Sequence, residues 1–103
     1  MKAILINPFD KTLLEIEHTG NYKNIYGLID ATLFDIVDID SKNNIFVDDE
    51  GLLKNNQEFF ECNGKVIAGK GLVLGNNDGY AEQTSLTIEE LSKKINWLEK
   101  YGN

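Results

Sequence analysis

The sequence predicts an α+β fold: a mixed, mostly antiparallel sheet of about five to seven strands with one short helix and one C-terminal helix. Three observations predict it, namely short runs that alternate apolar and polar residues, an Asn-Gly pair between two such runs, and a capping box before the last apolar stripe. The chain has 103 residues, 42% of them hydrophobic, which suits a single domain over residues 1–103.

Alternating or continuous apolar runs bounded by turn residues predict the strands. They are residues 3–6, 14–18, 34–39, 45–47, 59–62, 65–68 and 72–74. Asn63 and Gly64 stand between two of these runs, and both residue types accept the positive φ angles that a two-residue type I′ turn needs. Residues 59–74 are therefore expected to form an antiparallel hairpin.

Two segments have the periodicity of a helix. Residues 22–30 follow Asn21, a residue type that caps helices, and their apolar side chains recur at i, i+3, i+4 and i+7. Residues 88–101 follow Thr87, with Glu90 three positions later, which is the spacing of a capping box. An apolar stripe continues after this box, so we expect the C-terminal helix to run from residue 88 to residue 101.

Composition excludes several classes of function. The net charge is −7 and all ten basic residues are lysine, so the surface repels nucleic-acid phosphates and we expect no direct nucleic-acid binding. A single cysteine rules out an intrachain disulfide and favours a cytoplasmic location. No apolar run approaches the roughly 20 residues of a membrane span or the core of a signal peptide, so we expect an untargeted chain without a membrane partner.

Metal or cofactor chemistry has little support in the sequence. His18 and Cys62 are the only residues of their types, so His and Cys ligands cannot make a metal site within one chain. The acidic run from Asp48 through Asp49 to Glu50 could hold a cation or supply catalytic carboxylates, or it could be a solvated strand end. We therefore expect no cofactor and no metal.

A glycine-rich segment resembles a phosphate-binding loop and departs from it. Residues 64–71 match the pattern G-x-x-x-x-G-K, but Gly71 replaces the hydroxyl residue that should hold Mg²⁺. The segment also leads from a hairpin to a strand, where a phosphate-binding loop needs a helix N-terminus. Gly69 and Gly71 still allow close backbone approach to an anion, and Lys70 offers a point charge.

Two aromatic residues lie off the apolar stripe of the predicted C-terminal helix. At 100° per residue, Trp97 points away from Ile88, and Tyr101 lies 40° from Trp97. They could make a second packing contact inside the domain, or they could form an aromatic patch for a partner chain. We name Trp97 and Tyr101 as candidate interface residues of a homo-oligomer.

Three segments carry a family resemblance: residues 4–8, residues 45–52 with the box VDDEGL, and residues 69–75 with the sequence GKGLVLG. Together they resemble a family of short uncharacterised proteins encoded by phages and mobile elements. The resemblance extends up to Asp78 and carries no established activity, so no catalytic residue is transferred from it. It implies a setting, because small phage accessory proteins often inhibit a host system or act as decoys for it.

Three functions follow as hypotheses. The first is a non-enzymatic, counter-defence binding protein, a sponge that sequesters a small nucleotide-like ligand through aromatic stacking and Gly69, Lys70, Gly71, Asp48 and Asp49. Because one small chain offers little concave surface, this hypothesis expects pockets at the boundaries of a homo-oligomer. The second is an acidic inhibitor of a host protein that imitates the charge of DNA, and the third is a carboxylate-dependent hydrolase.

Overall fold

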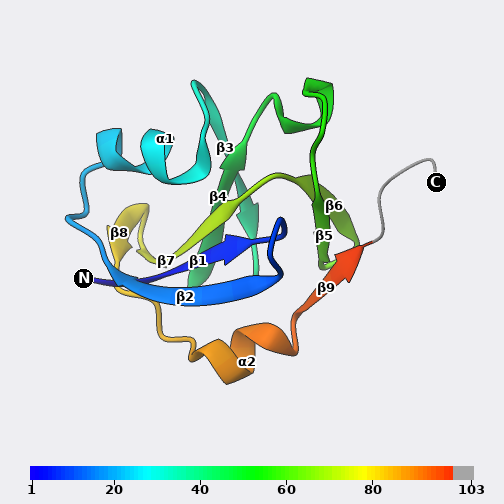
Figure 1. The fold of residues 1–103 in the computed structure, drawn as a ribbon. Coiled ribbons are helices and arrows are strands. Elements are labelled where there is room, and N and C mark those ends of the chain that lie inside the picture. The colour runs from blue at the N-terminus through cyan, green and yellow to red at the C-terminus, as the bar shows by residue number, and fades with distance from the viewer. Residues whose placement is uncertain (99–103) are drawn as a thin grey trace.

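Strands dominate the architecture. In the computed structural model, which describes residues 1–98, the first half forms β1 (Lys2–Asn7), β2 (Thr12–Glu17), α1 (Lys23–Ile29), β3 (Phe34–Asp38), β4 (Asn43–Asp48) and the 3₁₀ turn η1 (Gly51–Leu53). The second half forms β5 (Phe59–Cys62), β6 (Lys65–Ala68), β7 (Gly71–Asn77), β8 (Tyr80–Glu82), α2 (Ile88–Ser92) and β9 (Ile95–Leu98) (Figure 1).

The strands form two sheets. The six-stranded sheet has the order β2-β1-β7-β4-β3, and β8 pairs with the far end of β7. The three-stranded sheet has the order β6-β5-β9. Every strand pair within residues 1–98 is antiparallel, so the expected single mixed sheet is wrong.

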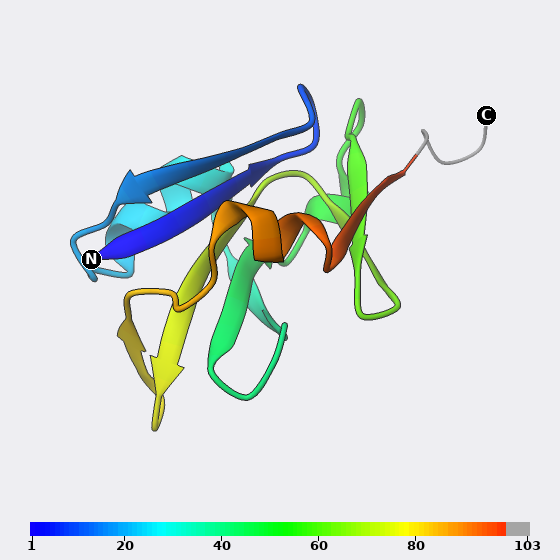
Figure 2. The ribbon, with the colours of Figure 1, turned by 90° about the horizontal axis from the view of Figure 1, so that it is seen from below.

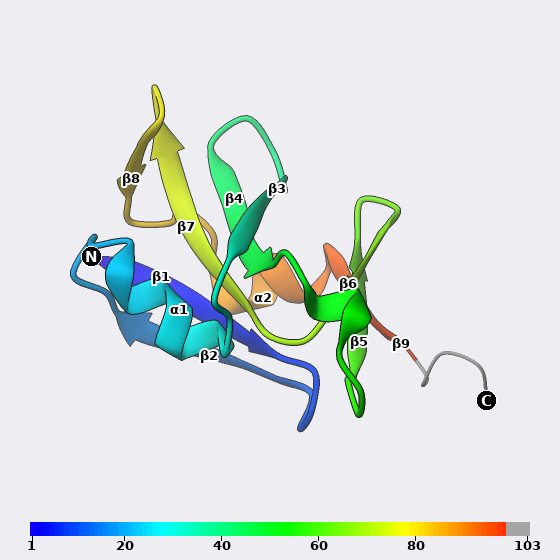
Figure 3. The ribbon, with the colours of Figure 1, turned by 90° about the horizontal axis from the view of Figure 1, so that it is seen from above.

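The large sheet is apolar on both faces, because side chains of β1, β4 and β7 alternate between two clusters. Under α1 lie Ala3, Phe46 and Leu72, which pack against Ile25 and Ile29 of the helix. The opposite face packs against the small sheet and α2 through Ile4, Ile6, Ile45, Val47, Val73, Phe60, Cys62, Ile67 and Leu91. Figures 1 and 3 show α1 and α2 on opposite sides of the large sheet.

The predicted α+β class is wrong at the C-terminus. The capping box is present, because Glu90 N–H donates to Thr87 Oγ1 at 3.1 Å and Thr87 N–H donates to Glu90 Oε1 at 3.0 Å. However, α2 ends at Ser92, and residues 95–98 form β9 instead of continuing to residue 101. The fold is a small β-rich one, and residues 99–101 of the predicted helix lie outside the described residues.

The reason for this correction is the free edge of β5. Once β5 has paired with β6, its other edge still has unpaired backbone groups, which β9 satisfies in the register Cys62↔Ile95 and Phe60↔Trp97. Ile95 and Trp97 suit a strand as well as a helix, because they alternate with the exposed Asn96. Figure 2 shows α2 leading directly into β9, the outer strand of the small sheet.

The predicted hairpin is confirmed for its first two strands. Cys62 pairs with Lys65, and the intervening Asn63 and Gly64 have φ angles of 52° and 80°, as a type I′ turn requires. β7 does not extend this hairpin but crosses to the large sheet, between β1 and β4. The short first helix is also present, but Asn21 precedes its N-cap residue, Tyr22.

Candidate functional site

Gly69 and Lys70, the predicted anion contacts, already have partners in the chain. Gly69 has a φ of +89°, where a side chain would be strained. Its N–H donates to the carbonyl oxygen of Glu58 at 2.9 Å, and Lys70 Nζ lies 3.0 Å from a carboxylate oxygen of Asp30. An anionic ligand would have to replace both interactions, and the ligand role of these residues stays a prediction.

Asp48 lines the same small cavity as Gly69 and Lys70, with a volume of about 100 Å³. Its buried carboxylate lies 2.5 Å from Lys54 Nζ, which also donates to the carbonyl oxygen of Asp30 at 2.9 Å. Two lysines therefore face two carboxylates, so the cavity has no excess positive charge for a phosphate. Its volume is also below the roughly 300–1,000 Å³ of pockets that enclose drug-sized ligands.

Gly71 and Asp49, the other two predicted ligand residues, lie outside this cavity. A Cβ atom on Gly71 would stand 2.7 Å from Cγ2 of Ile45, so close packing of β7 on β4 requires glycine there. Asp49 is exposed and borders a shallow groove of about 160 Å³ between β3 and β6. The structure thus brings Asp48, Gly69 and Lys70 together at one cavity, Asp49 shares only the groove with Asp48, and Gly71 lines neither.

Trp97 lies on β9, so its predicted position on a helix is wrong. Its ring packs edge-on against Phe60, with ring centroids 6.4 Å apart, and the side chain is half-buried. Its outer part borders an open groove with Lys11 and Ile88. The interface role of Trp97 stays a prediction, and Tyr101 lies outside the described residues.

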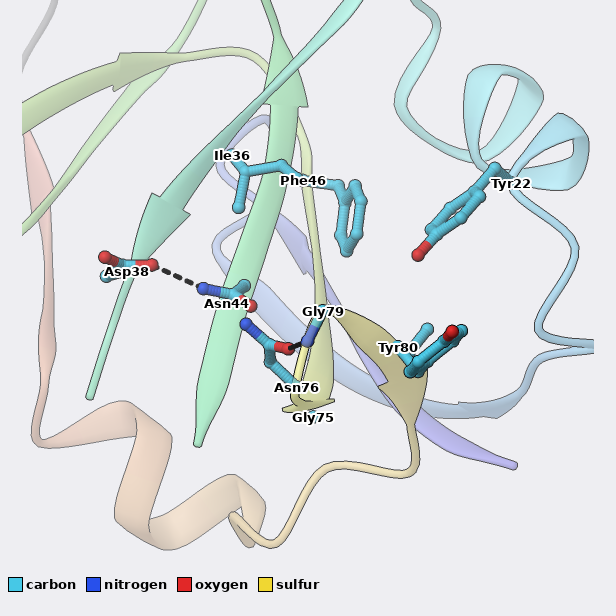
Figure 4. A pocket seen from close by; sticks show the side chains of 10 residues that line it. Tyr22, Ile36, Asp38, Asn44, Phe46, Gly75, Asn76, Gly79 and Tyr80 are labelled. Atoms are coloured by element: carbon cyan, nitrogen blue, oxygen red, sulfur yellow. Dashed lines mark hydrogen bonds between the residues drawn. The ribbon is translucent and has the colours of Figure 1, made fainter. Parts of the chain in front are cut away.

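A further pocket, which the sequence did not reveal, combines aromatic rings with polar groups. Tyr22, Phe46 and Tyr80 line it together with Asp38, Asn44 and Asn76, and its volume is about 170 Å³. The Tyr22 and Phe46 rings have centroids 5.8 Å apart, and Tyr80 is 78% exposed. Figure 4 shows the Tyr22 hydroxyl directed into the space between Phe46 and Tyr80.

Local turns position the aromatic residues of this pocket. Tyr80 follows the turn of the β7–β8 hairpin, where Asp78 and Gly79 have φ angles of 50° and 86°. An Asp-Gly pair is a signal for a type I′ hairpin, so this turn could have been found in the sequence. The sequence could not reveal that Tyr22 and Tyr80 converge on Phe46, because this depends on how α1 lies on the large sheet.

The turn before Tyr22 depends on a neutral histidine. His18 is buried, and its Nδ1 accepts a hydrogen bond from Gly20 N–H at 3.0 Å, so this nitrogen carries no proton. Burial, and secondarily the positive N-terminus of Met1, lower the pKa of His18 below its ordinary 6.5. His18 Nε2 is buried without a hydrogen-bond partner among the described residues.

Outside the pocket, the geometry gives little support for a metal site or a reactive thiol. Within residues 1–98, no cluster of three or more His, Cys, Asp or Glu side chains has the geometry to hold a metal ion. Burial, and secondarily Glu61, raise the pKa of the Cys62 thiol, which disfavours the nucleophilic thiolate. No helix in the described part of the chain is long and apolar enough to span a membrane.

Comparisons with known proteins give a family without an assigned activity. A family model described as a domain of unknown function, DUF3846, matches residues 1–101. No curated protein matches the chain, and no solved structure matches it.

Proposed function

This chain belongs to the DUF3846 family, and we propose that it is a non-enzymatic binding protein that sequesters a small nucleotide-like ligand by its base. The observation that carries the proposal is the pocket between α1 and the β7–β8 hairpin. It combines three aromatic side chains, Tyr22, Phe46 and Tyr80, with polar groups that have unused hydrogen-bonding capacity. A flat, polar-edged ring is the chemistry that such a pocket suits.

The size of the pocket restricts which part of the ligand it takes. A volume of about 170 Å³ suits a ring rather than a whole nucleotide, so the sugar and any phosphate remain outside. This agrees with the expectation of a homo-oligomer, in which a second subunit covers what one chain leaves exposed. The resemblance to phage proteins supports a counter-defence setting, in which the protein lowers the free concentration of a host signal.

Isothermal titration calorimetry with the four common ribonucleosides and their monophosphates tests the proposal. Stacking of a base on an aromatic side chain contributes about 1–3 kcal/mol, so Tyr80→Ala should weaken binding at least about fivefold. Phe9→Ala is the matched control, because Phe9 is an exposed aromatic residue that does not line this pocket. Lys70→Ala should leave affinity unchanged, because Lys70 lines the other cavity.

Absence of binding by every compound at millimolar concentration would refute the proposal. If Tyr80→Ala and Phe9→Ala weakened binding equally, the aromatic pocket would not be the binding site. A strong effect of Lys70→Ala would move the site to the cavity that Asp48, Gly69 and Lys70 share.

One observation favours the second candidate, an acidic inhibitor of a host protein. Strand β3 is an edge of the large sheet, and its exposed Asp35 borders the same groove as the exposed Asp49. A partner with a basic strand or helix could pair with such an edge. Capture of a host protein that is lost in an Asp35→Asn variant would support this function.

A further inference from the structure

The shallow groove between β3 and β6 lies between the outer strands of the two sheets. β3 ends the large sheet and β6 ends the small sheet, so neither has a neighbouring strand on its outer side among residues 1–98. Val37 and Val47 of the large sheet and Ile67 and Ala68 of the small sheet line the groove. All four side chains are buried, so the groove has an apolar floor.

The outer edge of β3 has backbone groups that no strand pairs. Ile39 N–H donates to the carbonyl oxygen of Asn43 at 3.0 Å, so in this antiparallel pair the odd-numbered residues of β3 direct their backbone groups to β4. The N–H and C=O groups of Phe34 and Ile36 therefore point away from β4. Their only partner within residues 1–98 is the Asp35 carboxylate, whose Oδ1 accepts a hydrogen bond from Ile36 N–H at 2.8 Å.

β6 has the same kind of edge. Gly69 N–H donates to the carbonyl oxygen of Glu58 at 2.9 Å, so Ile67 and Lys65, in steps of two, direct their backbone groups to β5. The backbone groups of Val66 point out of the small sheet and have no partner within the described residues. Val66 itself lines the groove, and its side chain is exposed.

Both ends of the groove are bounded. At one end Asn63, in the β5–β6 turn, donates from Nδ2 to the carbonyl oxygens of Asp38 at 3.1 Å and Ile39 at 2.8 Å. At the other end η1 lies against β6, since a Cβ atom on Gly51 would stand 2.5 Å from the carbonyl oxygen of Ala68. The space between them matches the four residues of β6, which is the length of a short extended segment.

The rim of the groove is acidic. Asp35 and Asp49 are exposed and border it, and neither has an ion-pair partner among residues 1–98. Asp48 is paired with Lys54, so Lys65 is the only other cation that the described part of the chain places at the groove. Because the rim and the whole chain, at −7, are negative, a basic occupant fits better than a second copy of this chain.

We propose that this groove binds one extended segment of a partner protein by adding it as a strand to the edge of β3. Apolar side chains of the segment pack on the groove floor, and basic side chains pair with Asp35 and Asp49. The incoming backbone replaces the Asp35 carboxylate at Ile36 N–H, and a neighbouring basic side chain then binds that carboxylate. The inference extends the second candidate function and is independent of base binding.

Isothermal titration calorimetry with a synthetic peptide in which valine and lysine alternate tests the proposal. A peptide in which valine and glutamate alternate should bind at least about tenfold more weakly. Asp35→Asn keeps the acceptor for Ile36 N–H and removes the charge, so it should weaken binding of the valine–lysine peptide about two- to fivefold. Asp78→Asn is the matched control, because Asp78 is exposed outside the groove and its φ of 50° suits asparagine; it should change affinity less than about 1.5-fold.

Ile36→Pro is the decisive variant, because it removes an outward N–H and leaves the hydrogen bonds between β3 and β4 in place. It should weaken binding of the valine–lysine peptide at least about tenfold. Glu15→Pro is the matched control on β2, the other edge of the large sheet. Met1 and His18 exchange backbone hydrogen bonds, so Glu15 N–H also points outward. This control should change affinity less than about twofold, and circular dichroism should show that both variants keep the fold.

Modified peptides make the same test without changing the protein. N-methylation of every valine, or of every lysine, removes the N–H donors along one side of the peptide strand. At least one of these two peptides should bind at least about tenfold more weakly than the unmodified peptide.

The inference is wrong if the valine–lysine peptide does not bind at millimolar concentration, or if the valine–glutamate peptide binds equally well. It is also wrong if both N-methylated peptides bind as tightly as the unmodified one. Equal effects of Ile36→Pro and Glu15→Pro would exclude the edge of β3 as the docking surface. The nucleoside titrations measure base binding separately, and capture of a host protein through Asp35 would still support the second candidate function.

Discussion

Asn43 joins the β3–β4 turn to the segment that precedes α2, and its replacement by alanine should destabilise the fold strongly. The side chain is 1% exposed. Its Oδ1 accepts hydrogen bonds from Thr84 Oγ1 at 2.6 Å and Ser85 N–H at 3.3 Å, while Nδ2 donates to Asp40 Oδ1 at 3.1 Å and Ser85 Oγ at 3.0 Å. All the polar capacity of this buried amide is used.

The size of the effect follows from these contacts. In Asn43→Ala, the buried Thr84 hydroxyl loses its acceptor, which costs about 1–3 kcal/mol. The groups of Asp40 and Ser85 that lose their hydrogen bonds can bind water instead, so their loss adds only about 1 kcal/mol. We expect a loss of about 2–4 kcal/mol in the free energy of unfolding, or a fall in Tm of at least about 8 °C for a chain of this size.

Urea unfolding followed by circular dichroism measures this change. Asn55→Ala is the matched control, because Asn55 is exposed, and it should stay within about 0.5 kcal/mol of the wild type. A double-mutant cycle of Asn43→Ala with Thr84→Val should give a coupling energy above about 0.5 kcal/mol. A loss no larger than that of Asn55→Ala, or strictly additive effects, would refute the reasoning.

Three further predictions concern the turn, the packing and the pH dependence, and a fourth concerns assembly. Gly64→Val should cost more than about 1 kcal/mol, because Gly64 has a φ of +80°; an unchanged Tm would contradict the type I′ turn. Gly71→Ala should cost about 1–3 kcal/mol by driving a methyl group into Ile45, and equal stability in urea would argue against that packing. The folded-state pKa of His18 lies below its ordinary 6.5, so below pH 6.5 the unfolded chain binds more protons than the folded chain. The free energy of unfolding should therefore fall as the pH is lowered from 6.5 towards the folded-state pKa. A His18→Gln variant should lose this slope, and an identical slope would assign it to other groups. Trp97→Ala should weaken self-association in sedimentation while the far-ultraviolet spectrum is kept, and a wild-type protein that is monomeric at micromolar concentration would contradict the expected homo-oligomer.

The candidate site shows where sequence reasoning reaches its limit. Gly69 and Lys70 drew attention because their pattern is local and resembles a phosphate-binding loop. The structure gives Lys70 a partner, Asp30, that is 40 positions away, and no local pattern predicts that ion pair. Tyr22 and Tyr80 lacked such a pattern. They line one pocket only because α1 lies on the large sheet, to which the β7–β8 hairpin belongs.

The sequence by itself determined the features that depend on neighbouring residues. Strands β1 to β7, the Asn63–Gly64 turn and the capping box at Thr87 follow from side-chain alternation, from allowed φ angles and from hydrogen bonds that span three residues.

Tertiary structure decided the features that depend on which segments meet. β7 lies between β1 and β4 because its two apolar faces need cover from both sides, although β6 precedes it in the chain. Residues 95–98 became a strand because the unpaired edge of β5 offers backbone hydrogen bonds, which outweigh the weak helical preference of a short segment with an ambiguous apolar pattern. The end of the capped helix was therefore set by a strand more than 30 residues earlier, beyond the reach of any local rule.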